Sequence, residues 1–206
     1  MKYLLIDTCT SNVTISIVIE NKILYTFNDK IICDMSSQIL PIIDKGLKEN
    51  NLTINDIEKI FVINGPGSFT GIRIGVTIAK IIAWSLNIPV VPISSLEFLA
   101  TTEINKKYIV PMIDARRGNV FAGIYDKNLK CIRNDQLIGL NTLLESIDDN
   151  YELVSYDVIN CCNPKVDILK LIMKHKNDKG VNPHMLYPNY LKLTEAEEKK
   201  KNDIRV

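Results

Sequence analysis

The sequence predicts an α/β protein of two lobes, each built on a mixed sheet flanked by helices. Three observations support this prediction. Short apolar strands joined by polar turns come first, and helical and strand patterns then alternate. The chain of 206 residues is long for one small domain. A second series of strands begins after a polar stretch at 103–107, so we expect lobes over residues 1–105 and 106–206.

Apolar periodicity predicts the elements of the first lobe in order. The expected strands cover 3–6, 13–19, 23–27, 57–64 and 90–93, and the expected helices cover 36–48 and 70–86. The first three strands read as an antiparallel meander because short polar turns join them. Ser94 or Ser95 can cap a third, short helix that has Glu97 in its first turn. This order predicts one mixed sheet with helices packed on it.

The second lobe begins with strands joined by tight turns, as the first lobe does. Its expected strands cover 108–113, 119–125, 130–133 and 152–155, and its expected helices cover 142–147 and 166–174. The first strand of each lobe ends in an aspartate, Asp7 and Asp114. The charged tail from Glu195 is expected to fray.

The charge, cysteine and histidine content argues against several classes of protein. Lys and Arg total 25 against 24 for Asp and Glu, a net charge of +1, which argues against a chain that grips nucleic acid mainly through its own basic surface. The five cysteines are an odd number without a Cys-x-x-Cys pair, so we expect a reducing compartment and no disulfide framework. His175 and His184 do not form a His-x-x-x-His pair, so no metal site is expected.

Nothing in the sequence favours export or a membrane location. The N-terminus enters a strand almost at once, without a signal peptide. Segment 72–91 is apolar enough to suggest a membrane span, but Arg73, Lys80, Asn87 and Pro89 interrupt it. We therefore expect a cytoplasmic protein.

The run GPGSFTGIRIG at 65–75 is the most informative motif. A strand enters it and a helix leaves it, a geometry that either holds an anion or lets the helix pack closely on another surface. It matches neither a Walker P-loop nor Gly-x-Gly-x-x-Gly. Arg73 could meet a phosphate or a carboxylate, or pair with an acid of its own chain. Asp7-Thr8-Cys9 has the composition of a phosphate-binding hairpin and equally of an ordinary polar turn. The candidate nucleotide-binding residues are Asp7, Thr8, Cys9, Gly65, Gly67 and Ser68.

The helix expected over 70–86 is apolar nearly all round. A stripe of small residues, four apart, lines one side of it: Gly71, Gly75, Ala79 and Ala83. Such a stripe allows another backbone to come unusually close. The helix can be a core helix of its own lobe, or one face can pack on the sheet and the other on a second chain. In the second case Thr77, Lys80 and Trp84 would lie at the edge of the contact.

Several motifs together resemble the TsaB (YeaZ) family, the partner subunits in bacterial synthesis of N6-threonylcarbamoyladenosine on tRNA. The glycine run at 65–75 resembles the family hallmark. Matches elsewhere are LIDT at 5–8, LP at 40–41, PISSLE at 92–97, DARRGNVF at 114–121 and PNYLK at 188–192. The chain departs from the family at Met35-Ser36, where a His-Ser pair is usual, and its second lobe is short.

The resemblance implies the two-lobed actin-like fold of acetate and sugar kinases, Hsc70 and actin. It also implies a non-catalytic subunit that binds and activates the catalytic subunit TsaD through its first two helices, with the ATPase TsaE joining the assembly. A homodimer through the same helices is expected in isolation, and tRNA contact only through the complex. No cofactor is expected apart from ATP or ADP at the subunit contact. The residues expected at the contact are Ile39, Ile42, Ile43, Gly71, Arg73, Gly75, Thr77, Ala79, Lys80, Ala83 and Trp84.

Two alternatives remain open. The first is a stand-alone kinase or phosphohydrolase of the same fold, in which Asp7, Thr8 and the glycine turn would hold ATP with Mg²⁺. The second is a metallopeptidase, which would need ligands that the sequence does not offer.

Overall fold

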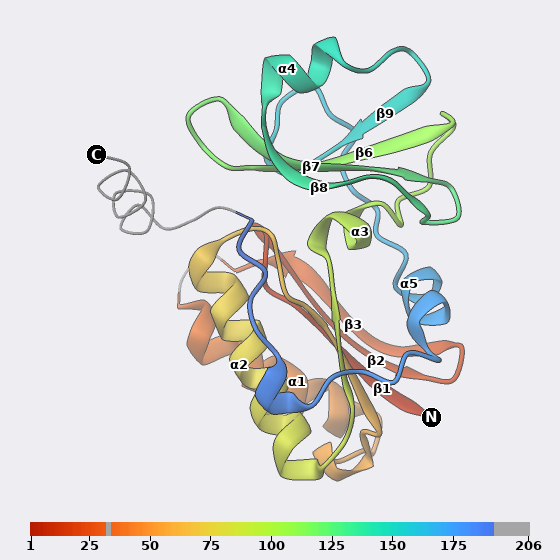
Figure 1. Cartoon of the computed structure of the whole chain (residues 1–206). Helices are drawn as coiled ribbons and strands as arrows, with labels where there is room; N and C mark the ends of the chain where they lie inside the picture. Colours follow the sequence, from red (N-terminus) through yellow and green to blue (C-terminus); the bar gives the residue numbers. More distant parts are fainter. Residues whose placement is uncertain (32–33, 192–206) are drawn as a thin grey trace, which may run out of the picture.

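A computed structural model describes residues 1–31 and 34–191. The first lobe contains a five-stranded sheet in the order β3-β2-β1-β4-β5 (Figure 1). Its strands are β1 (Lys2–Asp7), β2 (Asn12–Ile19), β3 (Lys22–Lys30), β4 (Lys59–Ile63) and β5 (Val90–Ile93). The pairs β1–β2 and β2–β3 are antiparallel, whereas β1–β4 and β4–β5 are parallel. The mixed sheet expected from the sequence is confirmed.

Helices cover both faces of this sheet. Figure 1 shows α1 (Met35–Glu49) and α2 (Phe69–Leu86) together on one face and α5 (Ile168–His175) on the other. The short helix η1 (Ile54–Asp56) precedes β4. Strand β2 therefore buries side chains of both faces, including Thr14 and Ser16. The alternation of apolar and polar residues in β2 correctly indicates a strand, but the polar face is also covered.

The second lobe contains a four-stranded sheet in the order β8-β7-β6-β9. Its strands are β6 (Tyr108–Asp114), β7 (Asn119–Asp126), β8 (Cys131–Gly139) and β9 (Tyr151–Val154), and α4 (Leu140–Glu145) follows β8. Strand β8 is longer than expected, and it pairs with β7 from Cys131 to Gly139 across two irregularities in register. Backbone hydrogen bonds to β7 keep these residues in the strand although several of their side chains are polar.

The expected boundary between the lobes is only partly right. Helix α5, assigned to the second lobe from the sequence, packs in the core of the first lobe through Ile168, Leu171 and Ile172. The segment that follows, with η2 (Pro183–Met185), also returns to the first lobe, where Val181 pairs with Val90. Residues 168–190 therefore pack mainly with the first lobe, whereas Leu191 packs against the core of the second. The expected fraying of the tail from Glu195 falls outside the described residues.

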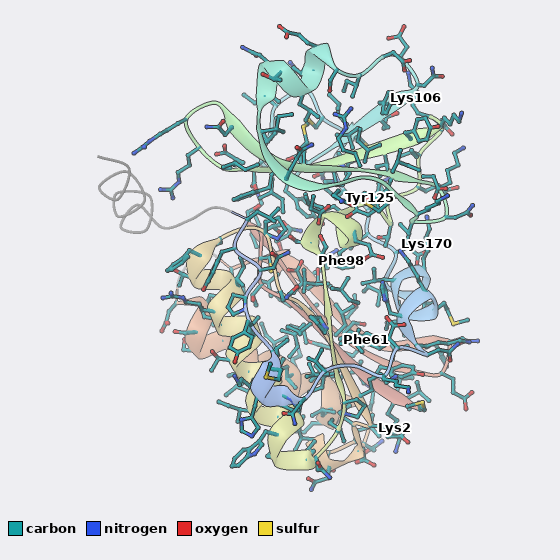
Figure 2. All side chains as sticks on the ribbon, viewed as in Figure 1. Lys2, Phe61, Phe98, Lys106, Tyr125 and Lys170 are labelled. Atoms are coloured by element: carbon teal, nitrogen blue, oxygen red, sulfur yellow. The ribbon has the colours of Figure 1, made fainter. Side chains whose placement is uncertain are left out.

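Helix α3 (Ser95–Leu99) lies between the two lobes. Ser94 caps it as expected, since its side chain accepts hydrogen bonds from the backbone N–H groups of Leu96 and Glu97. Phe98 belongs to the core of the first lobe, while Leu96 packs with the second lobe's core. Figure 2 shows this arrangement, with Phe61 deep in the first lobe and Phe98 close to Tyr125 of the second.

Candidate functional site

The glycine turn after β4 packs against the end of β1. A Cβ atom built at Gly71 would lie 2.0 Å from the carbonyl oxygen of Thr8, and one at Gly67 would lie 2.2 Å from that of Cys9. The Thr8 hydroxyl donates a hydrogen bond to the carbonyl of Gly71 at 2.6 Å. These glycines therefore allow close approach of α2 to the lobe's own backbone. The structure favours the packing role of the motif over the anion-binding role.

Several polar groups of this turn are already paired within the lobe. The backbone N–H of Ser68 donates to the carbonyl of Cys9 at 2.7 Å. The Ser68 hydroxyl caps α2 by accepting from the N–H of Gly71, and the Ser95 hydroxyl donates to the carbonyl of Pro66. A phosphate at this turn would have to compete with these hydrogen bonds.

Asp7 and Cys9 are buried beneath the turn. Asp7 is 2% exposed and accepts a hydrogen bond from the backbone N–H of Cys9 at 2.8 Å. Burial raises the pKa of Asp7 to about 7, although the hydrogen bond from Cys9 opposes the shift. The Cys9 thiol donates to the carbonyl of Ile63, and burial raises its pKa well above the usual value. A protonated, buried thiol is not a nucleophile.

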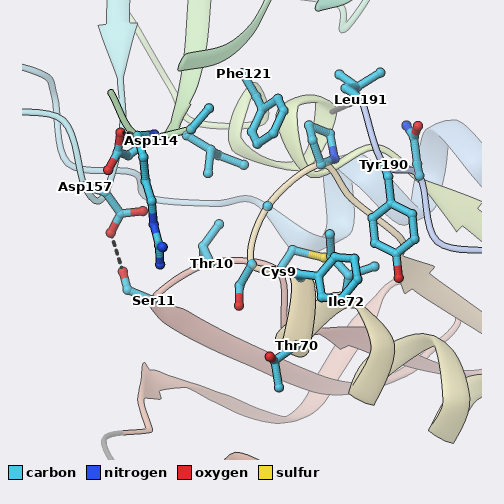
Figure 3. Close-up of a pocket in the computed structure, with 18 residues that line it drawn as sticks. Cys9, Thr10, Ser11, Thr70, Ile72, Asp114, Phe121, Asp157, Tyr190 and Leu191 are labelled. Carbon is cyan, nitrogen blue, oxygen red and sulfur yellow. Dashed lines mark hydrogen bonds between the residues drawn. The ribbon is translucent and has the colours of Figure 1, made fainter. Parts of the chain in front are cut away.

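A cleft of about 560 Å³ lies between the lobes. Figure 3 shows the turn after β1, the start of α2, the turn after β6 and the segment 189–191 around it. The Ser11 hydroxyl donates to the carboxylate of Asp157 at 2.8 Å and so joins the two lobes across the cleft. Asp114 and Arg116 also line this space. Two carboxylates beside one guanidinium make a poor site for a polyphosphate.

The cleft collects only part of the candidate nucleotide-binding set. Cys9, Gly67 and Ser68 line it. Asp7, Thr8 and Gly65 lie outside its lining, and Gly65 instead packs against the carbonyl of Asn189. The structure therefore brings three of the six candidate residues together at the cleft and places the other three outside its lining.

Metal ligands are not gathered in the described part of the chain. Within residues 1–31 and 34–191, no group of three or more His, Cys, Asp and Glu side chains is placed to hold a metal ion. The described cysteines, which exclude Cys33, are all free thiols: Cys9, Cys131, Cys161 and Cys162.

The small-residue stripe of α2 faces its own sheet rather than a partner. The side chains of Ala79 and Ala83 are fully buried, and a Cβ at Gly75 would meet the Thr8 hydroxyl. The expected contact residues that are buried within the first lobe are Ile39, Ile43, Gly71, Gly75, Ala79 and Ala83. The lobe's own sheet and helices already cover these six residues, so they are not on the surface of this structure.

The opposite side of α2 is exposed. Ile81 is 58% exposed and Trp84 is 63% exposed, although both side chains are large and apolar. Arg73 and Thr77 are exposed on the same side, and Lys80 is partly covered. We call these five residues the α2 face. Ile42 of the neighbouring helix α1 is half-buried.

Helix α2 also has the length and hydropathy of a membrane span. Over Phe69–Leu86 its mean hydropathy is 1.4, and it is the one helix of the described chain that meets this test. Its small-residue side packs on the sheet of the first lobe, and a core helix meets the same test.

The segment 181–191 runs along one flank of α2 (Figure 1). Asn64 fixes it at the cleft end, where the N–H of Asn189 donates to the Asn64 carbonyl at 2.7 Å. Lys80 donates to the carbonyl of His184 at 3.2 Å, and the ring of Trp84 meets that of His184 edge-on at 6.3 Å. We call this segment the strap. The sequence did not predict the strap, because the PNYLK motif near its end gives no sign that this segment contacts a helix about a hundred positions earlier.

Comparisons with known proteins agree with this architecture. A family model described as "TsaD: tRNA N6-adenosine threonylcarbamoyltransferase" matches residues 34–155. The tRNA threonylcarbamoyladenosine biosynthesis protein TsaB of Bacillus subtilis is 33% identical and aligns over 97% of each chain. The structure of YeaZ from Pseudomonas aeruginosa superimposes with a TM-score of 0.77 at 20% identity, over 92% of this chain and 99% of that one.

A second Pseudomonas aeruginosa structure, described as similar to peptidase YeaZ, gives a TM-score of 0.80 at 20% identity, over 93% of this chain and 99% of that one. These structures confirm the expected two-lobed α/β fold. By sequence similarity over nearly its whole length, the chain belongs to the TsaB family of tRNA threonylcarbamoyladenosine biosynthesis proteins.

Proposed function

We propose that this chain is a non-catalytic partner subunit in the synthesis of N6-threonylcarbamoyladenosine on tRNA. It binds the threonylcarbamoyltransferase TsaD through the α2 face and the adjoining surface of α1, and it activates that subunit. TsaE joins the assembly, and tRNA is contacted through the complex. In the absence of TsaD the same face pairs two copies of this chain. The free thiols of the described cysteines support a reducing, cytoplasmic location.

The observation that carries the proposal is the exposure of Ile81 and Trp84 on the side of α2 opposite its buried small-residue stripe. Large apolar side chains gathered on a helix face are typical of a protein interface, and tryptophan is enriched among the residues that dominate binding energy. Leu40 of α1, 54% exposed, is a further large apolar side chain on the surface of this lobe. Six of the eleven expected contact residues are buried within the lobe, and the others are exposed or partly exposed.

Three features support a non-catalytic role. The Cys9 thiol is buried and its pKa is raised, so it is a poor nucleophile. The described histidines do not converge on the cleft, since His175 pairs with Glu97 and Asp178. In the cleft the Ser11 hydroxyl is paired with the Asp157 carboxylate, but no histidine is among the residues that line it.

The alternative of a stand-alone ATP-dependent kinase or phosphohydrolase is less well supported. It needs Asp7 as a ligand for Mg²⁺, yet Asp7 is buried away from the cleft, with a pKa near neutrality. ATP hydrolysis by the isolated chain, lost in Asp7→Ala, would favour this alternative. ATP or ADP at the contact with TsaD does not require such turnover and remains part of the proposal.

The test is binding of purified TsaD from the same organism, measured by isothermal titration calorimetry. We expect Ile81→Asp to weaken binding by about 2 kcal/mol or more, because it places a charge in the apolar centre of the contact. The matched control is Ile132→Asp on β8, where the isoleucine is 48% exposed and lies far from α2 in the chain. An unchanged affinity in Ile81→Asp, or an absence of binding by the natural chain, would contradict the proposal.

A further inference from the structure

Arg73 is held in one orientation by two aromatic rings. Its guanidinium carbon lies 3.8 Å from the centre of the Phe69 ring, and its Nε donates a hydrogen bond to the Tyr190 hydroxyl at 2.8 Å. The two rings stack on each other with their centres 4.9 Å apart. We call Phe69 and Tyr190 the aromatic clamp. One ring comes from the start of α2 and the other from the strap, so the clamp forms only in the folded chain.

The outer end of the same guanidinium is unused. Among residues 1–31 and 34–191, the contacts of Arg73 are those with the aromatic clamp, and no acid of this part of the chain pairs with it. The pairing with an acid of its own chain, one of the alternatives from the sequence, is therefore not formed among the described residues. The two terminal NH₂ groups project from an exposed side chain. A planar fork that is already oriented matches a carboxylate through two parallel hydrogen bonds.

The two elements that hold Arg73 carry no acidic side chain. Neither α2 nor the strap contains Asp or Glu, whereas Arg73 and Lys80 both lie on the α2 face. On α1, Asp44 pairs with Lys48 at 2.7 Å and Glu49 with Lys45 at 3.8 Å. A second copy of the chain, related by two-fold symmetry about α2, would bring like charges together. An acidic surface on a different protein complements this face better.

We infer that Arg73, positioned by the aromatic clamp, determines which protein the α2 face accepts, and that the partner presents an Asp or Glu carboxylate to its guanidinium. Ile81 and Trp84 lie further along the same face and exclude water from the apolar part of the contact. The inference rests on the proposed function and adds the chemistry of the partner's surface. The interaction is selective because a fixed guanidinium loses little conformational entropy on binding.

The test compares TsaD binding by Arg73→Gln, Arg73→Lys and Tyr190→Phe with that of the natural chain. We expect Arg73→Gln to bind about tenfold to a hundredfold more weakly, as for loss of a charged hydrogen-bonded pair. Arg73→Lys should lose most of this affinity, since an ammonium group lacks the planar fork. Arg133→Gln is the matched control, because Arg133 on β8 bonds Ser146 in the second lobe. Arg73 is exposed, so thermal unfolding of its variants should match that of the natural chain.

The positioning role has its own readout, which does not involve TsaD. In the natural chain, ¹⁵N relaxation should show the Arg73 Nε–H group as ordered as the backbone, and in Tyr190→Phe as clearly more mobile. Equal mobility in the two proteins would overturn the role of the clamp.

The binding results separate the two claims. TsaD binding that is unchanged in Arg73→Gln would overturn the inference and leave the proposed function standing. Failure of the natural chain to bind TsaD would overturn both. Self-association that is lost in Arg73→Gln, without any effect on TsaD, would show that a second copy occupies this face and would overturn the inference.

Discussion

Substitution of Gly71 by alanine tests whether the glycine turn exists for close packing. The new Cβ would lie 2.0 Å from the Thr8 carbonyl oxygen, more than 1 Å short of the 3.4 Å of an ordinary contact. The obstacle is the backbone directly after the central strand β1, so the helix must move instead. Overpacking of this kind costs about 1–3 kcal/mol, and loss of the buried Thr8–Gly71 hydrogen bond costs about 1 kcal/mol more. The better helix propensity of alanine returns about 1 kcal/mol.

The net expectation is a loss of about 1–3 kcal/mol in the free energy of unfolding. Urea denaturation followed by circular dichroism measures it through the transition midpoint. Gly139→Ala is the control, because its φ of −62° suits alanine and its nearest neighbour, the Thr142 hydroxyl, lies at 3.4 Å. That variant should stay within about 0.5 kcal/mol of the natural chain. If Gly71→Ala were equally neutral, the packing account of the motif would be refuted.

Three further outcomes follow from buried titratable groups. Burial raises the pKa of Asp7 to about 7, so the folded chain holds this proton more tightly than the unfolded chain and loses stability as pH rises from about 4 to about 7. Urea denaturation at several pH values between 4 and 8 gives the free energy of unfolding of each protein as a function of pH. The natural chain should lose about 2–4 kcal/mol more over this range than Asp7→Asn does, and an equal pH dependence in the two proteins would contradict the prediction. Burial lowers the pKa of His175, but hydrogen bonds to two carboxylates outweigh it and hold the pKa above its usual value. The natural chain should therefore exceed His175→Gln in free energy of unfolding by the full amount below about pH 6.5, and this difference should decline as pH rises through the pKa of His175 in the folded chain. A difference that grows with pH would refute this prediction. In the native chain Cys9 should resist iodoacetamide while the exposed Cys162 reacts, and early labelling of Cys9 in peptide mass spectra would show that it is accessible.

Local patterns predicted the elements well, because strand and helix periodicities report which side chains are buried. The helix over 70–86 and its glycine turn were predicted within a residue. The surface against which the small-residue stripe packs was not predictable. The sequence pattern is the same whether the neighbouring backbone belongs to another chain or to the lobe itself. The register of β1 decides it by placing Thr8 against Gly71 and Gly75.

Contacts between distant segments account for the other errors. The pattern over 166–174 predicts a helix, but only tertiary packing shows that this helix lies on the first sheet. The aromatic clamp has the same origin, because Phe69 and Tyr190 meet through folding rather than through any spacing in the sequence. Residues that appeared as isolated aromatics in the sequence therefore form part of the candidate contact surface.

The return of α5 and the strap to the first sheet makes the second lobe an insertion within the first. The polypeptide crosses between the lobes twice, once on leaving α3 and once before α5. An expression fragment of the first lobe that stops near residue 105 would lack Ile168, Leu171 and Ile172 and leave one face of its sheet bare. The second lobe, by contrast, could be excised and its two ends joined by a short linker without removing any strand of the first sheet.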